Sequence, residues 1–233
     1  MGRYVGIVLS QMDYKDNDAL ISFLSKETGR ITLIAKGIRK PSSKNVYALQ
    51  PYTTVELIMD YEEGKTLFSF KSAVSVKNRR KLYDDLKRMS VAQVISEAIN
   101  AMDEQEDSYE LVEFCLDRLM EDKCENVLAL FLGQLLNILG IQPECEECVF
   151  CGNKKIKGFS VADGGFVCGN CSNAEEDINV LRRMRLLNHM DIAHYSYLGN
   201  YGDFSEKELD YLNDFLDTYS GIHLKSYSFL QSL

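Results

Sequence analysis

The sequence predicts an α+β protein in which a small five-stranded barrel precedes an α-helical domain with an inserted four-cysteine ribbon. Three observations support this prediction. Apolar and polar residues alternate over the first 78 residues, helical spacing of apolar residues begins near residue 80, and two Cys-x-x-Cys pairs lie in a polar stretch near residue 150. A period of two is typical of half-buried strands, and a period near 3.6 is typical of amphipathic helices. We therefore expect a barrel at residues 1–78, a helical domain at 79–233, and the ribbon at about 145–175.

The strands of the barrel are predicted from five short segments. Four of them alternate clearly, and Ala19–Ser25 is added as the fifth; the four are Val5–Leu9, Ile31–Ala35, Val55–Tyr61 and Phe68–Val76. Breaks at residues 27–30 and 62–65 each contain a glycine, which is typical of turns. Five short strands in fewer than 80 residues favour a closed antiparallel barrel, of which the oligonucleotide-binding OB-fold is a frequent example. An SH3-like barrel fits the same pattern.

The helices are predicted from apolar stripes after residue 80. One stripe consists of Leu82, Leu86, Met89, Ile95, Ala98 and Met102, and a second consists of Leu111, Cys115 and Leu119. The segment Val127–Leu139 is apolar nearly all round, so we expect it in the middle of a bundle. Further helices are predicted at Ile178–Met190 and Glu206–Tyr219, the latter preceded by Ser205 with Glu208 at the spacing of a capping box.

Composition places the chain among ordinary globular proteins, since 45% of the residues are hydrophobic and 26% are charged. No apolar run reaches the roughly 18 residues that a membrane span needs, and the chain opens without the apolar core of a secretory signal. We expect a cytoplasmic protein with reduced cysteines and no membrane partner.

Charge is divided unevenly along the chain. The net charge is −9, but residues 1–81 hold 14 lysines and arginines against 8 acidic residues, whereas residues 82–233 hold 12 against 27. Such asymmetry indicates modules with separate partners, although a solvated charged face needs no partner. The basic front half keeps nucleic acid open as a ligand.

Four cysteines carry the strongest chemical signal in the sequence. They are Cys148, Cys151, Cys168 and Cys171, in two Cys-x-x-Cys pairs separated by 16 residues, and a glycine follows Cys151 and Cys168. Each pair lets two sulfurs hold one ion from a tight turn, and this spacing is that of a structural Cys₄ zinc ribbon. We predict one structural zinc ion per chain, which would stabilise a segment too short to have a core.

Other uses of the cysteines are less well supported. Cys145 extends the first pair into a pattern that resembles part of an iron–sulfur ligand run, but the Cys-Pro finish is missing. A redox dithiol would need a βαβ pattern, and a zinc deaminase would need a His-x-Glu; neither is in the sequence. We interpret Cys145 as a bystander. Cys115 and Cys124 are interpreted as buried small hydrophobes.

Catalytic motifs are weak. Gly64-Lys65-Thr66 matches the end of a P-loop, but Met59 stands where the first glycine should be. The sequence contains no nucleophile elbow, zinc-protease motif or dinucleotide fingerprint. We therefore predict that the protein is not an enzyme.

Two basic clusters could neutralise phosphates. The first follows the third strand and contains Lys36, Arg39, Lys40 and Lys44; the second closes the barrel and contains Arg79, Arg80 and Lys81, with Lys77 beside them. Tyr47 and Tyr52 lie between the clusters and could offer stacking faces to bases. Solvated loops are often basic, so an unliganded charged surface fits the same residues.

The motifs together resemble the RecO family of bacterial recombination and repair mediators. The similar segments are "GIVLSQMDYKDNDALISFLSKETGRITLIAKGIRKPSSK", "LQPYTTVEL", "LGIQPECEECVFCG", "FSVADGGFVCGNC" and "TYSGIHLKSYSFL", which span nearly the whole chain. Cys145 departs from the pattern, because an aliphatic residue is expected there. The resemblance implies an OB-fold followed by a helical domain with the ribbon as an insertion.

The resemblance also implies a function without a catalytic cofactor. A RecO-like mediator binds single- and double-stranded DNA and anneals complementary strands. It works with RecR and with the single-strand binding protein, whose C-terminal tail is the expected contact, so that RecA can load; its expected location is the nucleoid. An alternative is a zinc-ribbon adaptor that binds only proteins. A redox or iron–sulfur enzyme is a third hypothesis, which visible colour of the purified protein would reveal.

Overall fold

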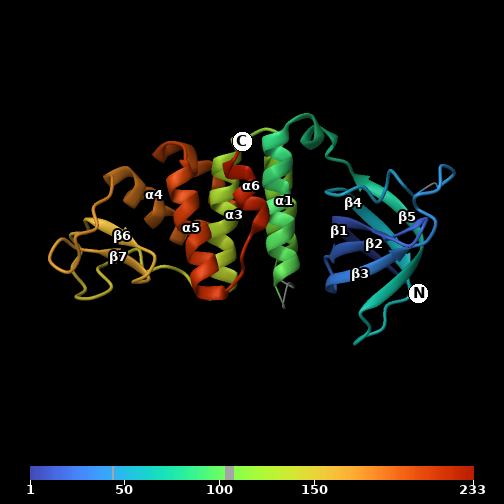
Figure 1. Cartoon of the computed structure of the whole chain (residues 1–233), viewed down its shortest axis with the longest axis horizontal. Helices are drawn as coiled ribbons and strands as arrows, with labels where there is room; N and C mark the ends of the chain where they lie inside the picture. The colour runs from blue at the N-terminus through green and yellow to red at the C-terminus, as the bar shows by residue number, and fades with distance from the viewer. Residues whose placement is uncertain (44, 103–107) are drawn as a thin grey trace. The chain divides into compact units, whose positions relative to one another are not determined.

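The computed structural model describes residues 1–43, 45–102 and 108–233 (Figure 1). They form two compact units, Met1–Met120 and Glu121–Leu233. The first unit contains the strands β1–β5, a short 3-10 helix η1 and the helices α1 and α2. The second contains α3 to α6, the 3-10 helix η3 and the ribbon strands β6 and β7. The predicted boundary at residue 78 lies inside the first unit and stays a prediction.

Within the described residues of the first unit, five strands close a barrel. They are β1 (Gly2–Tyr14), β2 (Asp18–Ser25), β3 (Gly29–Ala35), β4 (Thr54–Met59) and β5 (Leu67–Lys77). Their order is β1-β2-β3-β5-β4, with β4 pairing back to β1 and all pairs antiparallel except β3 with β5. This is an OB-like barrel, and it confirms the predicted fold class.

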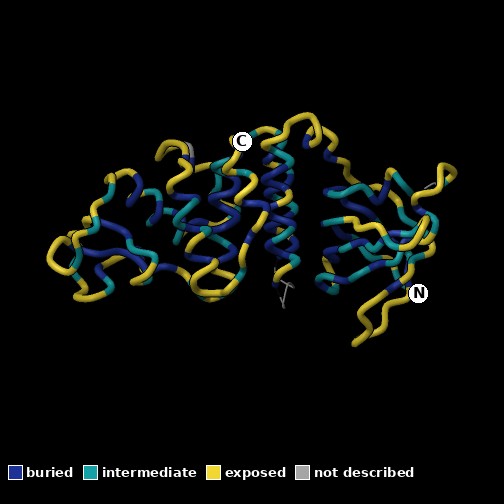
Figure 2. The backbone as a smooth tube through the Cα atoms, in the orientation of Figure 1, coloured by how far each residue is buried: buried dark blue, intermediate teal, exposed yellow. Residues whose placement is uncertain are grey.

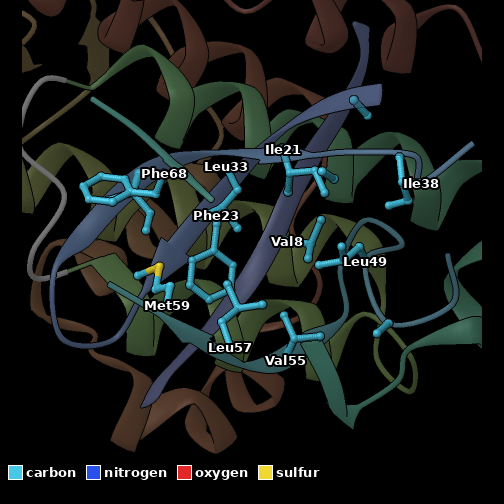
Figure 3. Packing of buried hydrophobic residues seen from close by; sticks show 14 residues of the cluster. Val8, Ile21, Phe23, Leu33, Ile38, Leu49, Val55, Leu57, Met59 and Phe68 are labelled. Carbon is cyan, nitrogen blue, oxygen red and sulfur yellow. The ribbon is translucent and has the colours of Figure 1, made fainter. Parts of the chain in front are cut away.

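The barrel interior is filled by one side-chain face of each strand and by the loop between β3 and β4. Figure 3 shows Phe23, Leu33, Leu57 and Phe68 packed together inside it. Ile38 and Ala48 to Leu49 of the loop join the same cluster. Burial of these side chains attaches the loop between β3 and β4 to the barrel core.

The burial pattern of strand β5 differs from the predicted alternation. Phe68 is buried, but Val74 and Val76 are 58% and 61% exposed rather than half-buried. The register explains the change: Phe70 pairs with Met59 but Ser72 pairs with Ile58, so a bulge lies between them. A bulge adds one residue to one strand and moves the side chains that follow it to the other face, here up to a second register shift between Ser75 and Lys77.

Strand β1 is buried on both faces over residues 6–9. Val8 points into the barrel cluster, whereas Ile7 and its partner Leu24 lie outside that cluster and are nevertheless fully buried. Helices α1 (Leu86–Ala101) and α2 (Tyr109–Arg118) contact β1, and Ser22 donates a hydrogen bond to Asn100 of α1 at 2.6 Å. The helices of this unit therefore cover the outer face of the first two strands.

Helix α1 also differs from its predicted stripe. Leu82 belongs to the separate 3-10 helix η1 (Arg80–Asp84), and extended Asp85 caps the start of α1, so Leu86 begins the helix and is exposed. The buried residues of α1 cover more than one face of it but leave the side of Gln93 exposed; they are Ser90, Val91, Ala92, Val94, Ile95, Ser96, Ala98 and Ile99. The second stripe, Leu111, Cys115 and Leu119, is buried as predicted.

The second unit is built around α3 (Cys124–Ile138), which is buried along most of its length (Figure 2). It contacts α4 (Ile178–His189) and α5 (Glu206–Ser220). The unit also contains β6 (Gly158–Ser160), β7 (Gly165–Val167), η3 (Ile192–Tyr201) and α6 (Lys225–Gln231). The capping box of Ser205 and Glu208 is present, and α3 has the central position that its apolar sequence predicts.

Candidate metal centre and nucleic-acid interface

Two similar turns present the cysteines. In the first, the N–H groups of Cys151 and Gly152 both donate to the carbonyl of Cys148, at 3.3 and 2.9 Å. In the second, the N–H groups of Cys171 and Ser172 donate to the carbonyl of Cys168, both at 3.1 Å. In each turn the first cysteine is buried and the second is exposed.

The ribbon holds the two turns against each other. The N–H of Val149 donates to the carbonyl of Phe166 at 2.9 Å, and the N–H of Phe166 donates to the carbonyl of Glu144 at 2.8 Å. Gly165 is required at this crossing, because a Cβ atom there would lie 2.2 Å from the carbonyl oxygen of Glu144. This close backbone approach fixes the second turn beside the first.

The four sulfurs converge on one point. The Sγ atoms of Cys148, Cys151, Cys168 and Cys171 all lie within 4.8 Å of one another, and those of Cys151 and Cys168 are 3.7 Å apart. The pairs that the sequence predicted as one ligand set are therefore brought together, and the four thiols can hold a metal ion.

Local hydrogen bonds polarise this cluster. Burial by itself would raise the pKa of Cys148, but N–H groups of Phe150, Cys168 and Cys151 donate to its sulfur and lower the pKa to about 6. Hydrogen bonds with the thiols of Cys151 and Cys168 instead raise the pKa of Cys171 to about 12. Four sulfurs this close cannot all carry a charge unless a cation is shared among them.

The remaining cysteines lie elsewhere. Cys145 is buried outside the four-sulfur cluster, and burial raises the pKa of its thiol. Its carbonyl accepts a 2.8 Å hydrogen bond from Nε of Arg185, which ties the start of the ribbon to α4. Cys115 and Cys124 are buried in helices.

The ribbon packs onto helix α5 of the same unit. The ring of Phe159 lies 4.9 Å from that of Tyr211 and 6.4 Å from that of Phe215. Glu176, just beyond the ribbon, accepts hydrogen bonds from Lys207 at 2.9 Å and from Tyr211 at 2.6 Å. The ribbon is thus packed and hydrogen-bonded against α5.

Part of the first basic cluster lines a surface depression of about 390 Å³. Lys36 and Lys40 line it together with Lys15 from the turn between β1 and β2. Two aspartates also line it, but Asp18 is engaged by the N–H of Gly37 at 2.7 Å. Sequence reasoning missed Lys15, because it stands apart from the "AKGIRKPSSK" run; its position in a turn between two strands was the available signal.

The other members of this cluster differ. Arg39 is exposed, but its guanidinium is paired with Asp13 at 3.0 Å, so part of its charge is compensated. Lys44 lies outside the described residues. In the part of the chain that the structure describes, Lys36 and Lys40 have no carboxylate within ion-pair distance of their ammonium groups.

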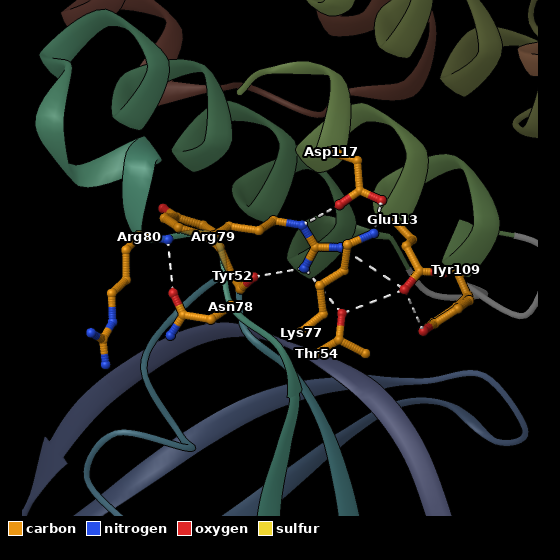
Figure 4. A network of polar contacts seen from close by, with 9 residues as sticks. All are labelled: Tyr52, Thr54, Lys77, Asn78, Arg79, Arg80, Tyr109, Glu113 and Asp117. Carbon is orange, nitrogen blue, oxygen red and sulfur yellow. Dashed lines mark hydrogen bonds and ion pairs between the residues drawn. The ribbon is translucent and has the colours of Figure 1, made fainter. Parts of the chain in front are cut away.

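Arg79 is corrected from a surface residue to a structural one. Its side chain is fully buried, and Figure 4 shows it directed toward helix α2. Nε donates to Asp117 at 2.7 Å, and Nη1 donates to the carbonyl of Tyr52 at 2.8 Å and to Thr54 at 3.0 Å. A guanidinium enclosed by these acceptors is not available to a phosphate.

Arg80 and Lys81 remain on the surface. The side chain of Arg80 points away from the Arg79 network in Figure 4, while its N–H is fixed by a 2.8 Å hydrogen bond to Asn78. Arg80 lines a second depression, of about 320 Å³, with Tyr47, Gln50, Tyr83 and Asp84. Tyr47 is exposed as a stacking residue must be, whereas Tyr52 is only 7% exposed and offers no free face.

Among the residues that the structure describes, no helix is long and apolar enough to cross a bilayer.

Comparison with known proteins gives one consistent result. A family model described as "Recombination protein O N terminal" matches residues 1–79, and one described as "Recombination protein O C terminal" matches residues 83–228. A curated protein named "DNA repair protein RecO" from Halalkalibacterium halodurans is 26% identical over 98% of this chain and 93% of its own length. A protein of the same name from Bacillus subtilis is 28% identical, with the same coverage of both chains.

Proposed function

The chain belongs to the recombination protein O family of DNA repair proteins, and from this premise we propose that it is a non-catalytic mediator that binds single- and double-stranded DNA and anneals complementary strands. The observation that carries the proposal is the convergence of Lys15, Lys36 and Lys40 on one depression at an end of an OB-like barrel. Clustered ammonium groups neutralise phosphates without reading bases, as a sequence-tolerant mediator requires.

The DNA-binding surface in this proposal comprises the accessible part of both predicted clusters. Its members are Lys15, Lys36, Arg39, Lys40, Arg80 and Lys81, with Lys44 kept as a prediction. Arg79 is left out because it is buried. Arg39 shares its charge with Asp13, so we assign it a smaller contribution than Lys40.

The metal of the ribbon is proposed to be one structural zinc ion. With Zn–S bonds of about 2.3 Å, a tetrahedron has sulfur–sulfur separations of about 3.8 Å. The 3.7 Å separation of Cys151 and Cys168 fits this geometry, as does a donor set of four sulfurs. The ion would balance the thiolate charge and hold the two turns together.

The proposed partners are those that the family resemblance implies. In this proposal the protein works with RecR and with the single-strand binding protein to assist the loading of RecA, and it acts at the nucleoid, where its DNA substrate lies. The positively charged barrel would bind DNA. The acidic helical half, whose charge repels phosphate, would bind proteins.

Salt-dependent binding tests the proposal. Fluorescence anisotropy with a labelled single strand should give an affinity that falls with salt, with a log–log slope of about −0.7 per neutralised phosphate. Replacing Lys36 and Lys40 with glutamine should lower affinity for all sequences and make the slope shallower by about 0.7 for each phosphate that is no longer neutralised. Arg39→Gln is the matched control, expected to have a smaller effect because of Asp13.

The opposite result would identify the alternative function. If the wild-type protein binds neither single- nor double-stranded DNA at low salt and anneals nothing, the ribbon and helical unit would belong to a protein adaptor. Binding that persists unchanged in the double lysine variant would place the DNA surface elsewhere on the chain.

A further inference from the structure

The depression beside Arg80 has walls of a different chemistry from the lysine-lined one. It is formed by Tyr47 and Gln50 from the loop between β3 and β4 and by Arg80, Tyr83 and Asp84 from helix η1. Its volume of about 320 Å³ lies within the range of small-molecule sites, roughly 300–1,000 Å³. Two aromatic rings, a guanidinium, an amide and a carboxylate therefore meet in one open site.

Both tyrosines are accessible. Tyr47 is 67% exposed and Tyr83 is 42% exposed, so a ligand can reach both rings. The Tyr83 ring is nevertheless fixed, because its hydroxyl donates a 2.9 Å hydrogen bond to the carbonyl of Pro51 and its ring lies 6.3 Å from that of Tyr52. A flat apolar surface is thus presented in a defined orientation.

The backbone that carries Arg80 is fixed as well. Arg79, immediately before it, is anchored by Asp117 and by the carbonyl of Tyr52. Tyr52 directly follows Pro51, whose carbonyl holds Tyr83, so one buried network positions both η1 and the loop opposite it. Arg79 is in this sense a positioning residue for the site.

We propose that this depression binds a single unpaired nucleobase of a DNA strand. The bases supply flat π-faces that stack on tyrosine, and stacking tolerates every sequence. The guanidinium of Arg80 has no carboxylate partner among the residues that the structure describes, and it would meet the phosphate next to the stacked base. The proposal rests on the proposed function, because it specifies how a DNA strand is held.

The carboxylate of Asp84 favours a base over a phosphate as the occupant of the depression. A carboxylate in the depression repels a phosphate, but it accepts hydrogen bonds from the amino group of a base such as cytosine. Gln50 offers both a donor and an acceptor. Any base can therefore stack between the aromatic walls, and a base with an amino group gains one hydrogen bond to Asp84 that thymine cannot make.

Fluorescence anisotropy with two labelled 15-mers tests the proposal: oligo(dC) and an abasic strand of the same length, which keeps the phosphates and lacks the bases. The wild-type protein should bind oligo(dC) more tightly, and Tyr47→Ala should lower the ratio of the two affinities by on the order of tenfold. Tyr47→Phe keeps the ring and should keep the ratio. Tyr201→Ala, which removes an exposed tyrosine of the other unit, is the matched control.

The outcomes separate this proposal from the proposed function. No binding of either strand by the wild-type protein would contradict both. Two outcomes would overturn only the base site. One is an unchanged ratio of the two affinities in Tyr47→Ala, and the other is an equal fall of this ratio in Tyr201→Ala. Because Tyr47 is largely exposed, its replacement should leave the fold intact, which circular dichroism checks.

A second variant tests the role of Asp84 without touching the rings. Asp84→Asn should weaken binding of oligo(dC) several-fold relative to oligo(dT), since thymine has no amino group that could donate to the carboxylate. An equal gain on both strands would show that a phosphate lies beside Asp84, and it would overturn the placement of a base there.

Discussion

At the scale of single residues, Cys168 offers a direct test of the metal site. Its sulfur is buried, lies 3.7 Å from that of Cys151, and its N–H donates to the sulfur of Cys148 at 3.4 Å. We predict that Cys168→Ser lowers bound zinc from one per chain toward zero and destabilises the helical unit, because metal binding in such sites contributes directly to folding. Metal analysis and thermal unfolding measure the two effects.

Cys145→Ser is the control for this substitution. Cys145 is equally buried but lies outside the sulfur cluster, so the variant should keep its zinc. The assignment would be contradicted by iron in the purified protein, or by full retention of metal after the replacement of Cys168.

At the scale of elements, the Arg79 network fastens helix α2 to the end of the barrel. We predict that Asp117→Asn lowers the free energy of unfolding by about 3 kcal/mol, the low end of the cost of breaking a buried ion pair, because Asp117 itself is partly exposed. Urea unfolding followed by circular dichroism measures the change. Glu175→Gln, which breaks an exposed pair with Lys157, should cost less than about 1 kcal/mol. Equal effects of the two variants would show that the network is not needed for stability.

The contact between the ribbon's exit and α5 should depend on pH. Burial tends to raise the pKa of Glu176, but hydrogen bonds from Lys207 and Tyr211 outweigh it and hold the pKa below its usual value of 4.5. A group whose pKa is lowered in the folded state stabilises the fold above its unfolded pKa, and this stability is lost as the pH falls through the folded pKa.

Glu176→Gln should therefore lower the stability at neutral pH and reduce its further loss on acidification. The difference in free energy of unfolding between wild-type and variant, measured from pH 7 to pH 3.5, should shrink as the pH falls. A difference that stays constant over this range would refute the role of the ionised carboxylate.

The same scale shows what sequence patterns can and cannot predict. Strand alternation and cysteine spacing are local properties, so the barrel, the ribbon and the four-cysteine cluster followed from them. The bulge that exposes Val74 and Val76 depends on how β5 pairs with β4. Arg79 and Arg80 are adjacent and chemically identical, and only the position of α2 decides which of them is buried. Long-range pairing of this kind leaves no local pattern.

At the scale of the whole molecule, the unequal charge distribution raises a problem for DNA binding. A chain of net charge −9 is repelled by DNA at long range, so the proposed DNA binding would need either local steering by the basic barrel or a protein tether. A tether through the tail of the single-strand binding protein would raise the effective concentration of DNA and could enhance overall binding by roughly 10² to 10⁴.

We predict that strand annealing proceeds on DNA coated with the intact single-strand binding protein and fails when that protein lacks its C-terminal tail. Binding to naked DNA should not change between the two preparations, and this comparison is the control. Equal annealing rates on both kinds of coated strand would indicate direct competition for DNA instead of a tether.

The burial of β1 on both faces limits where the chain can be truncated or joined to a relative. A fragment ending at residue 78 would keep all five strands but lack the helices that contact β1, leaving Ile7 and Leu24 open to solvent. Such a fragment would be prone to aggregate, whereas one ending at residue 120 would keep its cover. Chimeras between relatives should therefore join the chains near residue 120, so that the transferred barrel keeps α1 and α2 over its outer face.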